Sequence, residues 1–198
     1  MSAVEFDARE LPSRLEEARE SIGDVRVELL LERGDRRGMG WVGRDHAVIA
    51  HPLPGGRARL VTVPAPLMVD ALVRMNDVGP RRRAEPAPRI AVAPGELAQA
   101  LAARDPGRAR VAGAGRARAF AGLIEGLREH WRVATRWEPA AGRLGGRELE
   151  VLDTDGGYWI VVPDEPTVEL WPSTPTAVLA GLCRVFPLAT EMRAWTPR

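Results

Sequence analysis

The residues with the clearest chemical potential form the run DTDGG at positions 153–157. Alternating oxygen-bearing side chains that lead to a glycine are typical of the start of a calcium-binding loop. In this chain, however, Gly157 stands at the fifth loop position, Tyr158 replaces the bending glycine, and Asp164 replaces the bidentate glutamate of the twelfth position. We therefore interpret the run as a tight hairpin turn in which Gly156 and Gly157 adopt positive φ.

The other candidate metal ligands are the histidines and the single cysteine. Side chains alternate along a strand, so the odd separation of His46 and His51 directs them to opposite faces. His130 is distant in sequence, and no Cys-x-x-Cys or His-Glu-x-x-His spacing occurs. We expect Cys183 to be a small buried residue of the last helix and the protein to hold neither a metal nor a cofactor.

Two further patterns concern phosphate binding and catalysis. The run GAGR at 113–116 precedes a predicted helix, but it lacks the Lys-Ser/Thr of a P-loop and a preceding strand, so we interpret it as a flexible turn. None of the serines lies within a Gly-x-Ser-x-Gly motif, and no nucleophile is paired with a base at a recognisable spacing. The sequence therefore predicts a protein that is not an enzyme.

Arginine-rich stretches offer an alternative function. The arginines within 81–89 and 108–118 would bind phosphates if the two stretches folded together, although no aromatic residues for base stacking are interleaved with them. Lysine is absent from the chain, which we attribute to a GC-rich genome. Solvated loops are the simpler interpretation, and a phosphate-ligand or nucleic-acid-binding module remains the alternative. The arginines concerned are Arg81, Arg82, Arg83, Arg89, Arg108, Arg110, Arg116 and Arg118.

Length and charge limit the class of protein. The 198 residues suit one domain with its own core, and 28 basic against 27 acidic residues leave a net charge of +1, so the surface as a whole is no polyanion-binding field. One cysteine excludes an internal disulfide. The acidic first residues and the lack of an apolar stretch of about 20 residues argue against a signal peptide and a membrane span. We expect a soluble, cytoplasmic protein.

Residues 25–75 and 131–185 show the same order of predicted elements, namely three or four short apolar strands followed by one helix. The segments that match best are AVIAHP at 47–52 with YWIVVP at 158–163, and ALVR at 71–74 with GLCR at 181–184. We interpret the two stretches as an internal repeat that forms two halves of one domain. A repeated strand meander carries no chemistry of its own and favours a docking surface.

Hydrophobic periodicity places the individual elements. An amphipathic helix is predicted over 7–20, and the last helix, 175–186, presents Leu179, Leu182 and Phe186 on one face. The strand at 158–162 is apolar on both faces and is predicted at the centre of a covered sheet. Further strands are predicted at 25–31, 39–42, 47–50, 59–63, 131–137, 149–151 and 167–171, and further helices at 67–76, from residue 94, and over 120–127.

These elements predict an α+β fold. Its central antiparallel or mixed sheet is built from two related β-meander-plus-helix halves with quasi-two-fold symmetry and is flanked by helices. We expect a single domain over residues 1–198. It divides into half one at 1–78, a proline-rich linker at 79–89, half two at 90–188 and a loose tail at 189–198.

Several motifs occur together in a recognisable order. A meander ends in the helix start TVPAP at 62–66, a proline-rich linker follows, a second helix opens with VAPGEL at 92–97, and the hairpin LDTDGGYWIVV spans 152–162. These motifs resemble the EspG family, cytoplasmic chaperone-like proteins of type VII (ESX) secretion in actinobacteria. The resemblance runs from about residue 25 to residue 186, and its motifs are structural rather than catalytic.

The resemblance implies a partner as well as a fold. Family members bind the helical tip of PE-PPE heterodimers and keep it soluble until export. This chain is shorter than the longer members, so its client is left open between a PE-PPE-like pair and another small helical protein, and a homo-oligomer is left open too. The partner-binding residues that we predict are aromatic or arginine side chains on wet strands, namely Trp41, Arg44, Arg132, Arg136 and Trp171.

Overall fold

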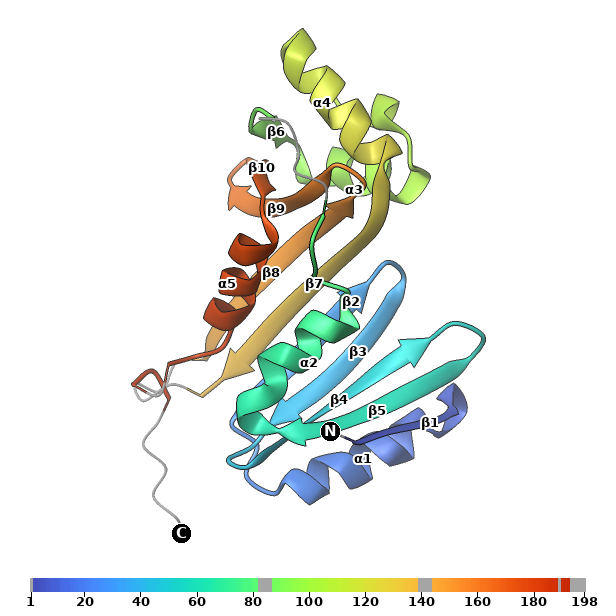
Figure 1. Cartoon of the computed structure of the whole chain (residues 1–198), viewed down its shortest axis with the longest axis vertical. Coiled ribbons are helices and arrows are strands. Elements are labelled where there is room, and N and C mark those ends of the chain that lie inside the picture. The colour runs from blue at the N-terminus through green and yellow to red at the C-terminus, as the bar shows by residue number, and fades with distance from the viewer. Residues whose placement is uncertain (1, 82–86, 139–143, 189, 193–198) are drawn as a thin grey trace. The chain divides into compact units, whose positions relative to one another are not determined.

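The structure, a computed structural model, describes residues 2–81, 87–138, 144–188 and 190–192. Within these residues, ten strands form one antiparallel sheet in the order β1-β5-β4-β3-β2-β7-β8-β9-β10-β6 (Figure 1). The predicted α+β class with a helix-flanked sheet is therefore confirmed. Arg82, Arg83 and most of the predicted tail at 189–198 lie outside the described residues.

Most predicted elements are found near their predicted positions, although α4 begins earlier than predicted and β8 is longer. The strands are β1 (Ser2–Asp7), β2 (Val27–Arg33), β3 (Arg36–Val42), β4 (His46–Leu53), β5 (Arg57–Pro64), β6 (Ile90–Val92), β7 (Leu127–Trp137), β8 (Gly145–Thr154), β9 (Gly157–Asp164) and β10 (Thr167–Ser173). The α-helices are α1 (Leu11–Ile22), α2 (Met68–Met75), α3 (Pro94–Ala103), α4 (Ala114–Glu125) and α5 (Pro175–Val185). Three short 3₁₀ helices are η1 (Ala8–Glu10), η2 (Ala65–Leu67) and η3 (Pro106–Arg108).

Each meander is preceded by a strand and a helix. β1 and α1 precede β2 to β5, and β6 and α3 precede β7 to β10. β1 pairs with β5 and β6 pairs with β10, so each leading strand joins the last strand of the meander that follows it. Neither leading strand was predicted, because charged residues interrupt the apolar pattern of β1 and the three residues of β6 are too few to show alternation.

Tertiary contacts divide the chain into two compact units, each built from several segments. The first unit comprises Met1–Asp77, Arg132–Glu148 and Gly181–Arg198, and the second comprises Val78–Trp131 and Leu149–Ala180. The single domain with halves at 1–78 and 90–188 stays a prediction.

In the first unit, helix α2 covers one face of the sheet (Figure 1). The strand register aligns Leu29, Gly40 and Ile49 on this face, and the buried residues of α2 are Met68, Ala71 and Leu72. Gly40 is required there, because a Cβ atom at this position would lie 2.6 Å from the carbonyl oxygen of Val48. The close approach of β3 to β4 thus selects glycine.

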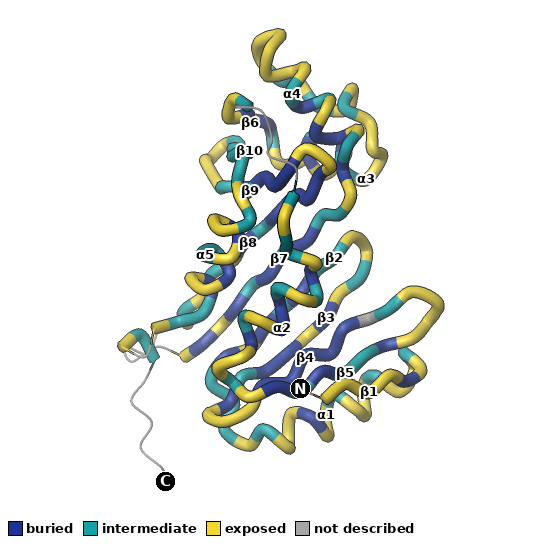
Figure 2. Tube along the Cα trace, viewed as in Figure 1, coloured by how far each residue is buried: buried dark blue, intermediate teal, exposed yellow. Residues whose placement is uncertain are grey.

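Strand β4 is buried on both of its faces. Ala47, Val48, Ile49 and Ala50 are each no more than 2% exposed, and α1 packs against this strand as well as against β3. His46 and His51 lie on opposite faces of β4, as predicted from their odd separation, and His46 is exposed whereas His51 is buried. Figure 2 shows the buried residues concentrated along the strands and the exposed residues on helix surfaces and turns.

The second unit has its own apolar core. Helix α4 contributes Phe120, Leu123 and Ile124, as predicted for a helix here. The helix ends at Glu125, so the predicted end at residue 127 was wrong, and Leu127 is the first residue of β7. Trp159 and Val161 of β9 join the same core and, with Tyr158, are buried, as predicted for a strand that is apolar on both faces. The other buried members of this core are Ile90, Val92, Leu97, Ala100, Leu127, Leu152 and Leu170.

Two predictions for helix α5 were wrong. Its buried residues include Val178, Leu182 and Val185, whereas Leu179 is 41% exposed. The prediction was right for Leu182 but placed the other two buried positions one residue too late, because a short apolar helix fits two overlapping faces about equally well. Cys183 follows Leu182 about 100° farther around the helix and is exposed rather than buried. None of the helices in the described ranges is both long and apolar enough to span a bilayer.

The DTDGG run forms the predicted hairpin between β8 and β9. Thr154 pairs with Gly157 across the turn, and Gly157 has a φ of +122°. Gly156 does not adopt a positive φ, so that part of the prediction was wrong. The carboxylate of Asp153 forms an ion pair with Arg81.

Candidate partner-binding groove

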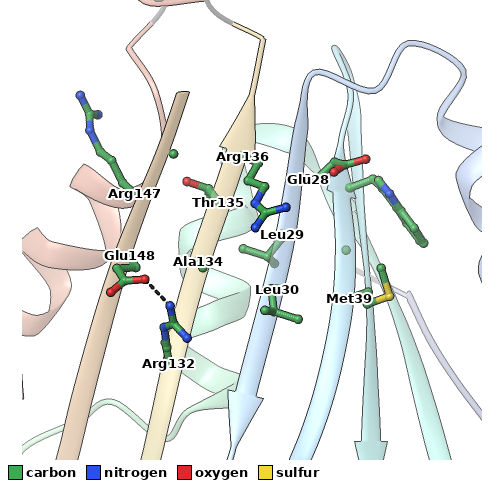
Figure 3. A pocket seen from close by; sticks show the side chains of 13 residues that line it. Glu28, Leu29, Leu30, Met39, Arg132, Ala134, Thr135, Arg136, Arg147 and Glu148 are labelled. Carbon is green, nitrogen blue, oxygen red and sulfur yellow. Dashed lines mark hydrogen bonds and ion pairs between the residues drawn. The ribbon is translucent and has the colours of Figure 1, made fainter. Parts of the chain in front are cut away.

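A groove of about 560 Å³ crosses β3, β2, β7 and β8 in the first unit. Figure 3 shows side chains from these four strands along the groove. It lies on the face of β7 that helix α5 leaves uncovered, because the Thr135 hydroxyl points to the other face and donates a hydrogen bond to the carbonyl oxygen of Val185, 2.6 Å away. The groove is therefore on the side of β7 opposite α5.

Cross-strand contacts define the order of side chains in the groove. On β2 and β3, Glu32 lies opposite Arg37, Leu30 opposite Met39, and Glu28 opposite Trp41. Arg132 of β7 approaches Glu32 to 3.4 Å and also forms an ion pair with Glu148 of β8. Since neighbouring strands are antiparallel, two-residue steps from these contacts place Ala134 beside Leu30 and Gly146, and Arg136 beside Glu28.

The groove therefore has a low floor. Its floor residues, Met39, Leu30, Ala134 and Gly146, are apolar, and the last two have almost no side chain. Met39 is 47% exposed, and Leu30 and Ala134 are half-buried. Longer charged side chains stand on each side of this row, so the small residues create the depression.

One side of the groove, here called the closed flank, is a ladder of paired charges. It consists of Arg37, Glu32, Arg132 and Glu148, with alternating sign along the row. The Arg37 Nε atom lies 3.0 Å from a Glu32 oxygen. Each exposed pair stabilises the fold only slightly, but the ladder satisfies its charges within the protein.

The opposite side, here called the open flank, consists of Glu28 and Arg136. Both residues are exposed, and neither forms an ion pair with any residue that the structure describes. Trp41 lies in the same row as Glu28 but is only 6% exposed. The open flank thus offers one acid and one base to a partner.

Arg147 of β8, between the groove residues Gly146 and Glu148, directs its side chain to the opposite face of the strand and holds the C-terminal segment in place there. Its guanidinium donates to the carbonyl oxygens of Arg184 and Phe186, each at 3.2 Å, and pairs with the carboxylate of Glu191. The Leu188 backbone N–H, which donates to Glu191, and the Arg147 guanidinium lower the pKa of Glu191. The guanidinium also lies 5.4 Å from the centre of the Trp137 ring.

Three of the five predicted partner-binding residues line the same groove, namely Trp41, Arg132 and Arg136. Trp41 is only 6% exposed, and α1 packs against its strand, β3, and against the neighbouring β4. It therefore supports the groove from below and is not the exposed anchor that was predicted. Arg44 is exposed at the rim of a different cleft in the first unit. Trp171 belongs to the second unit, where its indole N–H donates to Glu169 at 2.7 Å and Arg89 stacks 3.7 Å from its ring centre.

The floor residues and four of the six flank residues were missed by sequence reasoning. Leu30, Met39, Ala134 and Gly146 are ordinary apolar or small residues, and Glu28 is an ordinary acid on a wet strand. The alternation of side chains on each strand was the signal that these residues shared. It predicts which face of a strand is exposed to solvent, but it does not predict which strands are neighbours in the sheet. Aromatic and arginine residues were favoured because they dominate known binding hot spots.

The arginine-rich alternative loses several of its side chains to internal contacts. Arg81 is bound to Asp153, Arg89 stacks on Trp171, and Arg108 pairs with Asp105 at 3.3 Å. Arg110, Arg116 and Arg118 are exposed. The side chain of Arg81 is only 11% exposed, so the predicted solvated loop was wrong for this residue.

No family model matches this sequence, and no curated protein matches it. Among solved structures, the chain is similar to that of the Mycobacterium tuberculosis type VII secretion system chaperone EspG5 in complex with a PE25-PPE41 dimer. The match has a TM-score of 0.50 and 14% sequence identity, and it covers 96% of this chain and 100% of that chain. This chain has an EspG-like fold. The predicted resemblance is thus confirmed for the fold, and the similar protein is a type VII secretion system chaperone.

Proposed function

We propose that this protein is a non-catalytic, cytoplasmic chaperone of type VII secretion. It binds a helical secretion substrate, either a PE-PPE-like pair or another small helical pair, and keeps it soluble. The EspG-like fold supports this proposal, since EspG5 is a type VII secretion system chaperone in complex with a PE25-PPE41 dimer. The observation that carries the proposal for this chain is the shape of the groove on β3, β2, β7 and β8.

The dimensions of the groove suit an α-helix that lies across the strands. Four strands spaced about 4.8 Å apart give a groove roughly 14 Å long, which equals about nine helical residues. The two flanks are four residues apart along β7, or roughly 13 Å, and a helix with its side chains is about 10–12 Å wide. A helix would therefore rest on the floor between the flanks.

Burial of an apolar helix face would supply the binding energy. Met39 and Leu30 are apolar and accessible, and the small residues Ala134 and Gly146 leave space for larger side chains of the client. Covering these residues removes apolar surface of both partners from water, which contributes about 25 cal/mol per Å² before the costs of association. Such shielding is how the chaperone keeps an aggregation-prone helix soluble.

The partner-binding residues that we propose are Arg132 and Arg136 on the flanks, Trp41 beneath the groove, and Arg44 and Trp171 as contacts outside it. Arg44 and Trp171 are retained because a client larger than one helix would extend beyond the groove. Arg132 acts through its ion pairs with Glu32 and Glu148, which hold the side chains of the closed flank in position.

Co-elution tests the proposal. The protein is co-expressed with the PE25-PPE41 dimer and with helical pairs encoded beside its own gene, and the mixtures are separated by size-exclusion chromatography. We expect at least one pair to co-elute and to remain soluble. Ala134→Leu, which fills the floor, should abolish this complex, whereas Ala117→Leu on the exposed part of α4 should not. Failure of every pair to co-elute would refute the chaperone role.

A further inference from the structure

The two flanks of the groove differ in whether their charged residues are paired within the protein. The closed flank pairs each of its charges within the protein, whereas Glu28 and Arg136 of the open flank form no ion pair with the described residues. Both open-flank residues are exposed. A client therefore finds charges that are not paired within the described protein on one side of the groove only.

The acid and the base of the open flank lie on different strands, so their order across the sheet is fixed. Glu28 is on β2 and Arg136 is on β7, and these strands are neighbours in the sheet (Figure 3). A helix that lies across the strands meets the acid first and the base one strand later, or the reverse. The separation of about 4.8 Å corresponds to about three residues of helix rise, so the two complementary client residues stand at i and i+3.

We infer that Glu28 and Arg136 select a client helix by the order of an acid and a base beside its apolar stripe, and so set the direction in which the helix lies. This inference rests on the proposed function. When the apolar stripe of the helix rests on the floor, the charged side of the helix faces the open flank in only one of the two possible directions of the helix. In that direction, only one order of the two charges places a base near Glu28 and an acid near Arg136. The reverse order places like charges together at both positions.

Two synthetic helical peptides of about 18 residues test the inference, a length at which helices form in water. They share one leucine stripe and carry, on the same side of it, either Lys-x-x-Glu or Glu-x-x-Lys. Each exposed ion pair changes affinity about two-fold, so exchange of two attractive contacts for two repulsive ones should change the Kd roughly ten-fold. The preference should shrink with added salt, because exposed charges are screened.

A charge-swapped protein supplies the decisive comparison. Glu28→Arg combined with Arg136→Glu keeps the net charge and should reverse the preferred peptide order. The matched control, Glu125→Arg combined with Arg128→Glu, swaps an exposed acid and base of the second unit and should leave the preference unchanged.

The outcomes separate the inference from the proposed function. Peptides that bind without an order preference, or with a preference that the swap leaves unchanged, overturn the inference alone. A helical pair that co-elutes equally well with the wild-type and swapped proteins also overturns it. If neither peptide nor any helical pair binds, the inference and the proposed function fail together.

Discussion

Arg81 and Asp153 form a bidentate ion pair between segments that are 72 residues apart in the chain. Arg81 Nε lies 3.0 Å from Oδ1 and Nη2 lies 2.9 Å from Oδ2, and the side chains are only 11% and 5% exposed. Beside this pair, the Tyr158 hydroxyl accepts a hydrogen bond from the Gly79 backbone N–H at 3.1 Å. The hairpin motif that resembles the EspG family therefore anchors the start of the linker to the sheet.

Removal of one member of this pair should destabilise the protein strongly. Arg81→Ala or Asp153→Asn should lower the free energy of unfolding by about 3 kcal/mol, because the remaining buried group loses its partner. Urea denaturation measures the effect. Replacement of both residues by apolar ones, Arg81→Met with Asp153→Leu, should cost less than either single change, and Arg116→Ala on exposed α4 serves as a neutral control. Single variants as stable as the wild type would contradict the structural role of the pair.

Gly40→Ala should destabilise the first unit by about 2 kcal/mol or more, because its Cβ would meet the carbonyl oxygen of Val48 at 2.6 Å and backbone must move. The matched control is Gly122→Ala within α4, where a Cβ atom has nothing within 4 Å. That change should stabilise the protein by about 0.5–1 kcal/mol, as alanine favours a helix interior. Thermal denaturation of both variants gives the comparison, and equal midpoints would count against the close approach of β3 and β4.

The C-terminal segment should detach in acid. The lowered pKa of Glu191 means that its contribution to stability is present above the unperturbed value of 4.5 and is lost as the pH falls below it through the folded-state pKa. The Leu188 amide proton, which donates to Glu191 at 2.7 Å, should change its NMR shift over that range. Glu191→Gln should remove the titration, and an unchanged Leu188 titration in this variant would rule out Glu191 as its source.

Cys183 should react with a thiol reagent such as DTNB in the native protein, without denaturant, because its side chain is exposed on α5. The expected stoichiometry is one thiol per chain. Cys183→Ser should abolish the reaction while changing the unfolding midpoint little, as expected for an exposed site. A thiol that reacts only in denaturant would instead support the buried position that the sequence suggested.

Sequence patterns predicted most elements because their causes are local. Alternation identified β2, a continuous apolar run identified β9, the DTDGG run identified the β8–β9 turn, and the helical spacing of Phe120, Leu123 and Ile124 identified α4. Short elements escaped prediction. The three residues of β6 gain their strand conformation from pairing with β10, which no local pattern records.

The candidate site was predicted only in part for a related reason. Arg132 and Arg136 were chosen as long side chains on a wet strand, and they do line the groove. Trp41 was expected on the surface but is covered, because burial depends on what packs over a strand face and not on the strand itself. The floor residues carried no signal of their own, since their role comes from being smaller than their neighbours.

By itself, the sequence determined an α+β chain of strand meanders and helices, with a hairpin at 153–157 and no recognisable catalytic or metal-binding motif. Only the tertiary structure decided that Arg132 meets Glu32, 100 residues away, and that Arg81 meets Asp153. The physical reason is that side-chain periodicity depends on local backbone geometry, whereas the register between distant strands depends on the packing of the whole sheet. The groove exists only in that register.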